Sequence, residues 1–415
     1  MSATPAHGLR KMTGRDPLEQ FRTATPLELL FDLTFVVAFG VAASEFAHAL
    51  SQNHVGPGLV AFAFATFAVW WAWMNFSWFA TAYDTDDWLY RLITMVQMVG
   101  VIILALGLPQ MFASLDEGQH VDNRVMVGGY VVMRIAMLTQ WLRAAHQDPA
   151  HRPACLTYAV TISVAQIGWV ALIVVNTSLV TTFVLMTPLF VIELTGPWIA
   201  ETRTGGTPWH AHHIVERNAL LTIIALGEGV VGTVASLSAV VSAQGWSVDA
   251  ALVALAGIGL TFGLWWVYYT LPAGQLLHVH RERSFVFGYL HLPLVGAIVA
   301  TGAGLHAAAY YIEHQSKLWS VATVLSVAIP VAAFIAVVYV LYMVLVRTTD
   351  AFHLLLVALT GVMLIASVAL AAAGLRMSVC LLIVTLAPVV TVVGFEAIGH
   401  RHMDEALNRS LAEGE

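Results

Sequence analysis

Long apolar runs are the feature that most limits how this chain can fold. About twelve segments are mainly apolar, and each is long enough to cross the ~30 Å hydrocarbon core of a bilayer as a helix. These segments are 27–50, 57–80, 89–113, 124–145, 155–176, 179–200, 213–241, 247–271, 285–310, 318–346, 351–373 and 377–398. The sequence therefore predicts an all-α, polytopic membrane helix bundle of about twelve transmembrane helices.

The composition agrees with a membrane protein. Of the 415 residues 59% are hydrophobic and only 10% are charged, whereas soluble domains carry roughly 25% charged residues. Too few polar residues are present to cover a soluble globule, so we expect the lipid bilayer as partner. Basic patches interleaved with aromatic residues do not occur, which argues against a nucleic-acid partner. Cys155 and Cys380 lie in apolar stretches and predict neither a disulfide framework nor a thiolate metal site.

The positions of Lys and Arg predict the topology. If the N-terminus is cytoplasmic, fourteen of the eighteen basic residues fall at the inner ends of the segments, Arg134 falls within a segment, and only Arg124, Lys317 and Arg376 fall at outer ends. This asymmetry indicates a multi-pass inner-membrane protein with both termini in the cytoplasm. The N-terminal segment 1–26 and the tail 399–415 are then cytoplasmic. We expect no removable signal peptide, because the apolar run that follows residues 1–26 is longer than a signal peptide's apolar region.

Similar residues recur at nearly constant offsets along the chain. Glu28 corresponds to Glu216 at an offset of 188, and Gly100 corresponds to Gly296 at an offset of 196. Trp70-Trp71 likewise corresponds to Trp265-Trp266. The offsets predict two parallel six-helix repeats, 27–200 and 213–398, joined by a linker at 201–212.

Two acids in the first apolar run are the first candidate site. A carboxylate in hydrocarbon is costly and is usually functional or paired. Glu28 and Asp32 are four residues apart, so they share one helical face. Two close carboxylates in a low dielectric resist double ionisation, which indicates a proton or cation site. The alternative for Glu28 is a capping box with Thr25, with Pro26 at the first helical position.

Glu228 is the single residue that points most strongly to a functional site. It lies near the middle of segment 213–241, between Gly227 and Gly229. Glycines allow close approach of a backbone or a substrate. A structural ion pair with an arginine is the alternative.

Arg134 and Glu193 form the expected charge pair inside the first half. Both lie within apolar segments, and an unpaired charge there is costly, so a salt bridge between them is predicted. Arg134 could instead hold an anionic substrate, or pair with Glu228 or Glu45.

Three aspartates, Asp84, Asp86 and Asp87, precede the third segment. They are either ligands for a hard cation or a solvated turn that caps the next helix. Arg91, one turn further on, is expected to pair with Glu28 or Asp32. The inner ends of three segments would then share one polar network, made of Glu28, Asp32, Arg91, Glu216 and Arg217.

His213 and Glu216 are weak candidates for a metal site. They are three residues apart, and imidazole and carboxylate suit zinc or iron. Histidines in loops are more often solvated, and no spacing here matches a zinc framework. We therefore expect no metal and no cofactor.

Aromatic residues gather at the ends of the second and third segments. They are Trp78, Phe79, Tyr83, Trp88 and Tyr90. Such residues usually form an interfacial belt, and this is the expectation here.

Three motifs give the chain a family resemblance. They are PLELLFDLTFVVAF from Pro26, YDTDDWLYRL from Tyr83 and HIVERNALLTIIALGE from His213. With them the chain resembles the low temperature requirement protein A family of bacterial membrane proteins over roughly residues 20–400. The resemblance implies a polytopic helical protein of the inner membrane and supplies no reaction. The motif residues that carry over are Glu28, Asp32, Arg91, Glu216, Arg217 and Glu228. Gly229 stands where family members often have serine.

Three classes of function follow from these observations. A transporter or permease of a small solute or ion is favoured, with Asp32 and Glu228 as titrating or coordinating groups and Arg134 as their charge partner. A membrane-embedded enzyme acting on a lipid or apolar metabolite is the second class. A sensor or scaffold without turnover is the third. The substrate and the oligomeric state are not encoded in recognisable motifs.

Overall fold

The computed structural model of the chain describes residues 8–19, 22–175, 177–347 and 351–412, and this part is helical without any β-strand. Within it, twelve helices are long and apolar enough to cross a membrane. The predicted all-α membrane bundle is therefore confirmed. Asn176, at a predicted segment boundary, lies outside the described residues, as do the first seven residues of segment 1–26 and the last three of the tail 399–415.

The helices begin and end as follows. Those of the first part are α1 (Pro26–Ser51), α2 (Val55–Tyr83), α3 (Trp88–Glu117), α4 (Arg124–Gln147), α5 (Arg152–Val175), α6 (Leu179–Arg203) and α7 (Ala211–Gln244). Those of the second part are α8 (Val248–Tyr269), α9 (Ala273–Val279), the 3-10 turn η1 (Arg281–Arg283), α10 (Ser284–Ile312), α11 (Ser320–Val346), α12 (Ala351–Ala372), α13 (Met377–Gly394), the π-helical turn η2 (Phe395–Gly399) and α14 (His400–Ala412).

Packing divides the chain into two compact units. Unit 1 comprises residues 1–42 and 67–217, and unit 2 comprises residues 43–66 and 218–415. The boundary between the two units falls within α1, α2 and α7. The predicted repeats are defined by offsets between similar residues in the sequence, whereas the units are defined by packing.

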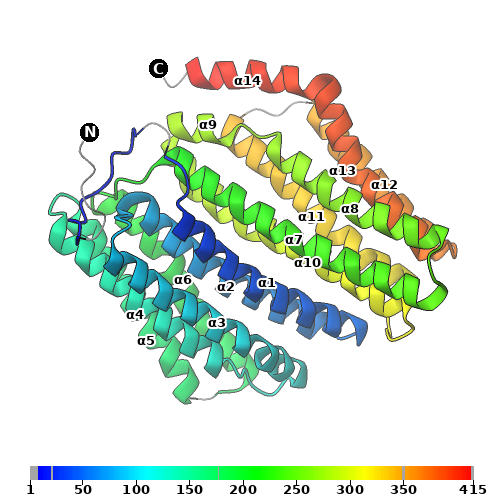
Figure 1. The fold of residues 1–415 in the computed structure, drawn as a ribbon, viewed down its shortest axis with the longest axis horizontal. Coiled ribbons are helices and arrows are strands. Elements are labelled where there is room, and N and C mark those ends of the chain that lie inside the picture. The colour runs from blue at the N-terminus through cyan, green and yellow to red at the C-terminus, as the bar shows by residue number, and fades with distance from the viewer. Residues whose placement is uncertain (1–7, 20–21, 176, 348–350, 413–415) are drawn as a thin grey trace. The chain divides into compact units, whose positions relative to one another are not determined.

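In unit 1, consecutive helices pack side by side. α3 packs along α4, α4 against α5 and α5 against α6, as Figure 1 shows for α3, α4 and α5. The first turns of α1, the last turns of α2 and the first turns of α7 belong to the same unit. Each of these helix ends carries polar residues, and together they form the candidate site described below.

In unit 2, α10 packs along α11, and α13 packs along both α8 and α12. The chain leaves α13 through η2, and α14 then contacts α9. A π-helical turn is rare and often marks a functional or strained position.

The aromatic residues at the end of α2 and the start of α3 do not form an interfacial belt. Phe79, Tyr83 and Tyr90 are fully buried and Trp78 is 8% exposed, whereas Trp88 is 49% exposed. The expectation is wrong for these four buried residues, because their rings pack inside unit 1. Phe79 and Tyr83, for example, both make edge contacts with the indole of Trp141.

Glycines bring α3 and α4 into close contact. A Cβ atom on Gly129 would lie 2.5 Å from the carbonyl oxygen of Gly100 and 2.6 Å from the backbone nitrogen of Leu104. Small residues at helix crossings let backbones approach in this way in membrane proteins. A Cβ atom on the neighbouring Gly128 would have no such contact within 4 Å.

This crossing can be tested with two adjacent alanine substitutions. Gly129→Ala is expected to cost ~1–3 kcal/mol, because overpacking against backbone atoms cannot relax easily. Gly128→Ala, the matched control, is expected to leave stability unchanged or raise it by up to ~1 kcal/mol through helix propensity. Thermal unfolding of both variants in detergent measures the difference, and equal melting temperatures would contradict the close crossing.

Candidate functional site

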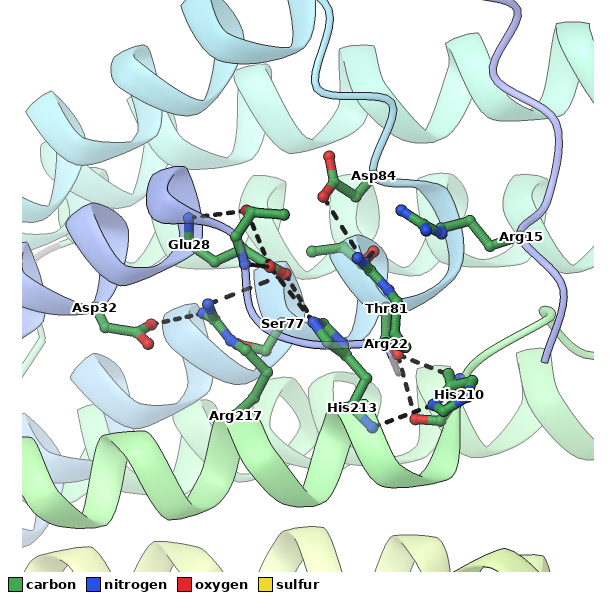
Figure 2. A network of polar contacts seen from close by, with 12 residues as sticks. Arg15, Arg22, Glu28, Asp32, Ser77, Thr81, Asp84, His210, His213 and Arg217 are labelled. Carbon is green, nitrogen blue, oxygen red and sulfur yellow. Dashed lines mark hydrogen bonds and ion pairs between the residues drawn. The ribbon is translucent and has the colours of Figure 1, made fainter. Parts of the chain in front are cut away.

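A buried polar cluster lies at one end of unit 1, where α1 begins, α2 ends and α7 begins (Figure 2). Its central side chains are Glu28 and Asp32 of α1 and His213 and Arg217 of α7, all at 0% exposure. The sequence placed all four near helix ends, but only the fold brings α1 and α7 together.

Glu28 serves both as a helix cap and as a member of the cluster. Its Oε2 accepts hydrogen bonds from the Thr25 backbone nitrogen at 2.7 Å and from the Thr25 hydroxyl at 3.0 Å. The Glu28 backbone nitrogen donates to Thr25 Oγ1 at 3.3 Å. The predicted capping box is thus confirmed. Its Oε1 lies 3.3 Å from His213 Nε2 and 4.0 Å from Arg217 Nη1.

Asp32 and Arg217 form a closer ion pair. Arg217 Nη2 lies 2.5 Å from Asp32 Oδ1, which also accepts a hydrogen bond from Trp73 Nε1 at 2.7 Å. The same guanidinium donates to Ser77 Oγ at 3.2 Å and lies over the Trp73 ring, 5.7 Å from its centroid. The α2 side chains therefore fix the position of this pair.

Several polar atoms of the cluster are left without hydrogen bonds. In the described part of the chain, no hydrogen-bond partner reaches Asp32 Oδ2, Glu28 Oε1, His213 Nδ1, or Nε and Nη1 of Arg217. Native proteins leave few buried polar groups unsatisfied, and each such group calls for an explanation. Unsatisfied donors and acceptors in one place suit a group that is bound and released, such as a proton, a water molecule or a small ion.

A second ion pair borders the cluster. Arg22 Nη2 lies 3.7 Å from Asp84 Oδ2, and both residues are less than 10% exposed. Arg22 also donates to the Ala80 carbonyl at 3.1 Å, and Asp84 Oδ1 accepts from the Asp86 nitrogen at 2.9 Å. Burial, and next the negative charge of Glu28, raise the pKa of Asp84 to about 6 despite the nearby Arg22. Sequence reasoning missed Arg22, because nothing local distinguishes it from other arginines of a polar N-terminal segment.

The three aspartates before α3 bind three different arginines. Asp84 pairs with Arg22 as described, Asp86 with Arg91 at 2.8 Å, and Asp87 with Arg143. They do not share one cation. The prediction that Arg91 pairs with Glu28 or Asp32 is wrong, because the Arg91 side chain is 59% exposed and turns back to Asp86.

Asp87 caps α3 as predicted, but its side chain is buried and not solvated. Its Oδ1 accepts from the Tyr90 nitrogen at 2.8 Å, which caps α3, and its side chain is fully buried. Burial alone would raise the pKa of this carboxyl, but hydrogen bonds from Arg143, Tyr90 and Arg10 hold it below its ordinary value.

The N-terminal segment lies across this end of unit 1. The Arg10 nitrogen donates to Asp87 Oδ2 at 3.1 Å, and the Gly14 nitrogen donates to Asp148 Oδ2 at 3.2 Å. The Glu19 carbonyl lies 2.8 Å from Nε2 of the buried His210. These contacts attach the segment to the helix ends that surround the cluster.

Arg134 and Glu193 form a separate buried pair within unit 1. Arg134 Nη2 lies 2.7 Å from Glu193 Oε2, which also accepts from Trp71 Nε1 at 2.7 Å. Arg134 Nη1 donates to Asn75 Oδ1 at 3.2 Å. The predicted salt bridge between Arg134 and Glu193 is confirmed.

Two further acids that the sequence singled out, Glu228 and Glu216, form no ion pair among the described residues. Glu228, in unit 2, is 7% exposed, and no ion pair or hydrogen bond within the described residues involves its carboxylate. A Cβ atom on Gly302 would lie 2.6 Å from the Glu228 carbonyl, so α10 packs closely on this turn of α7. Glu216 is half-buried and does not join the central cluster.

The histidines near α7 do not assemble a metal site. Among the residues that the structure describes, no group of three or more His, Cys, Asp or Glu side chains is placed to hold a metal ion. His213 faces Glu28, and the His213 backbone nitrogen donates to His210 Nδ1 at 3.2 Å.

Comparison with known proteins gives one family and one relative. Residues 23–388 match the family model described as bacterial low temperature requirement A protein (LtrA). The chain is 26% identical over 324 residues to an uncharacterized protein of Rhizobium meliloti (strain 1021), RA0937, and the alignment covers 73% of each chain. No solved structure matches the chain.

The coupling between Asp32 and Arg217 is measurable by a double-mutant cycle. Asp32→Asn or Arg217→Gln alone is expected to cost ~3–5 kcal/mol, because each leaves a buried charge unpaired. The double variant should recover ~1–3 kcal/mol relative to the sum of the single losses. The exposed pair of Asp122 and Arg124, with a side-chain exposure of 67% at the arginine, is the control and should couple by less than ~1 kcal/mol. Additive effects at Asp32 and Arg217, measured by thermal unfolding, would refute the pair.

Stability should also depend on pH through Asp84. Because the pKa of Asp84 is raised from 3.8 to about 6, the folded chain binds more protons there than the unfolded chain. The contribution of Asp84 to the free energy of unfolding should therefore fall as pH rises from about 4 to about 7. Asp84→Asn should remove this slope, and the control Asp86→Asn should keep it. Melting temperatures across this pH range measure both, and parallel curves for wild type and Asp84→Asn would contradict the shift.

Proposed function

This chain belongs to the bacterial low temperature requirement A family, and we propose that it is a membrane transporter that moves a small solute or ion and binds a proton or small cation in its buried cluster. The observation that carries the proposal is the charge balance of that cluster. Three carboxylates, of Glu28, Asp32 and Asp84, face two guanidinium groups, of Arg22 and Arg217.

The excess carboxylate needs one more positive charge. A net charge in a buried site is unfavourable, since attraction between partners must offset the loss of hydration. His213 lies 3.3 Å from Glu28 and is fully buried, so a proton on the imidazole or on a carboxyl would neutralise the cluster. A small cation would do the same. A site that must gain and lose one unit of charge is what ion-coupled transport requires.

Glu228 supports the same proposal from unit 2. It lies near the middle of α7 and forms no ion pair within the described residues, so its carboxyl is most stable when protonated or bound to a cation. Membrane acids of this kind commonly mark ion or proton paths. A scaffold whose acids serve only packing would instead pair each of them.

Corresponding contacts within each unit support the proposed six-helix repeats, 27–200 and 213–398. In unit 1 the indole of Trp71 donates to Glu193, and in unit 2 the indole of Trp266 donates to Glu396 at 3.0 Å. Trp71 and Trp266 are the tryptophans related by the sequence offset. Duplicated halves are common in transporters. The proposal also includes location in the bacterial inner membrane with both termini cytoplasmic, which the distribution of Lys and Arg supports.

An enzyme is the second candidate, favoured by one observation. The imidazole of His213 and the carboxylate of Glu28 lie together at one end of the helices, an arrangement suited to acid–base work. If the wild type converts a lipid or apolar metabolite and His213→Gln does not, the enzyme proposal would replace the transport proposal.

Ion flux in liposomes tests the transport proposal. The purified full chain, reconstituted around a pH-sensitive dye, is expected to move protons or small cations down an imposed gradient. Glu28→Gln keeps the capping box, because glutamine also serves at that position, but removes the titrating group and should abolish the flux. Glu228→Gln should do likewise.

Glu396→Gln is the control, because Glu396 is an exposed acid, and it should keep the wild-type rate. Flux in Glu28→Gln equal to that of wild type would exclude the cluster from the mechanism. No flux of protons, sodium or potassium in the wild type would overturn the proposed function.

A further inference from the structure

Unit 1 contains a cavity where α3 ends, α4 begins and α5 leads into α6. Its volume is about 340 Å³, at the small end of the range for ligand pockets, roughly 300–1,000 Å³. The cavity is distinct from the buried cluster, because the cluster borders the start of α3 and this helix of 30 residues is ~45 Å long. We therefore consider the cavity as a site of its own.

The lining of the cavity is polar in one part and apolar in another. The polar part comes from the connection between α3 and α4 and from the first residue of α4, and it includes His120, Asn123 and Arg124. The apolar part comes from the last turn of α5 and from α6, and it includes Ile173 and Met186. A ligand that fits both parts carries a polar group on an apolar body.

Hydrogen bonds fix the connections that form the cavity. The backbone nitrogen of Leu179, at the start of α6, donates to the Gln119 carbonyl at 3.1 Å. The backbone nitrogen of Asp122 donates to the Ser114 hydroxyl at 2.9 Å. The two connections are thus joined to each other and to α3, so the site is formed before any ligand binds.

Asn123 provides a buried polar group that has no partner in the protein. It immediately precedes α4, where an asparagine side chain usually accepts a hydrogen bond from the first turn of the helix, but here it makes no such bond. Its side chain is 6% exposed, and no hydrogen bond within the described residues involves it. A buried amide without a partner is costly. Since Asn123 lines the cavity, its amide is available to a ligand there.

The remaining charged groups favour an anion over a cation. Arg124 donates from Nε and Nη2 to Asp122 at 2.8 and 2.6 Å, and Gln110 Nε2 donates to the same carboxylate at 2.7 Å. Both oxygens of Asp122 are therefore occupied. Arg124 Nη1 makes no hydrogen bond within the described residues, and the N-terminus of α4 adds a partial positive charge.

We propose that this cavity binds a small organic carboxylate, with its charged group at Asn123 and Arg124 and its apolar body against Ile173 and Met186. Guanidinium groups and helix N-termini are both suited to carboxylates. The apolar part of the lining favours an organic anion over an inorganic one, because burial of the body adds to the binding free energy. The site goes beyond the proposed transport and does not depend on it.

Calorimetric titration of the full chain in lipid nanodiscs tests the site, with benzoate as the probe and benzamide as its neutral counterpart. Benzoate is expected to bind about tenfold more tightly than benzamide or better, because only the ion pairs with the guanidinium. Arg124→Gln and Asn123→Ala should each weaken benzoate binding by about tenfold or more. Arg91→Gln is the matched control, since Arg91 is another exposed arginine paired with a nearby aspartate, and it should keep the wild-type affinity.

Asp122→Asn separates anion binding from a structural role of these residues. It removes the negative charge that holds two nitrogens of Arg124, so it is expected to tighten benzoate binding by about two- to fivefold. Weaker binding in this variant, with an unchanged melting temperature, would overturn the proposed anion site. A purely structural role predicts no gain in affinity from the loss of an ion pair.

Other results would also overturn the proposal. They are the lack of saturable benzoate binding up to about 10 mM, equal affinities for benzoate and benzamide, and tighter binding of inorganic phosphate than of benzoate. Wild-type affinity in folded Arg124→Gln and Asn123→Ala would place benzoate elsewhere and overturn the site. Proton flux is measured separately, so its absence in the wild type would remove the proposed transport and leave the carboxylate site in place.

Discussion

The ion pair between Arg217 and Asp32 is the interaction on which the interior of unit 1 depends. It joins residues 185 positions apart and fixes the start of α7 against the start of α1. Removing either charge would leave the other in a dry interior, where desolvation is not offset. Because the pair holds the two helices together, it also determines where His213 and Glu28 meet. The geometry of the cluster thus follows from this contact together with the α2 side chains that hold it.

Helix α2 supports the acids of unit 1 with neutral donors. Indole nitrogens of Trp71, Trp73 and Trp78 donate to Glu193, Asp32 and Glu201, which lie on α6 and α1. An indole N–H satisfies a carboxylate oxygen without cancelling its charge. Such contacts orient an acid while leaving its protonation to other groups, which suits a protein whose acids bind and release a proton.

The two units treat their membrane acids differently. The buried cluster of unit 1 sets three carboxylates against two arginines, whereas in unit 2 Glu228 has no ion pair among the described residues. The arrangement in unit 1 favours carboxylates whose charge is balanced by several neighbouring groups. The arrangement in unit 2 favours a neutral carboxyl. Both make a change of protonation inside the helices possible, and this common property underlies the proposed transport.

The sequence by itself determined the helices, their number and the local contacts. Apolar runs must form helices because lipid offers the backbone no partners, and the capping box of Thr25 and Glu28 follows from spacing alone. The pair of Arg134 and Glu193 was predictable because each charge needed a partner within the hydrocarbon. Only the tertiary structure decided that Arg91 binds Asp86 and that Asp84, paired with Arg22, is buried. Those pairings depend on which helix ends meet and on the course of the N-terminal segment, and contacts between residues so distant in the chain leave no periodicity or spacing in the sequence.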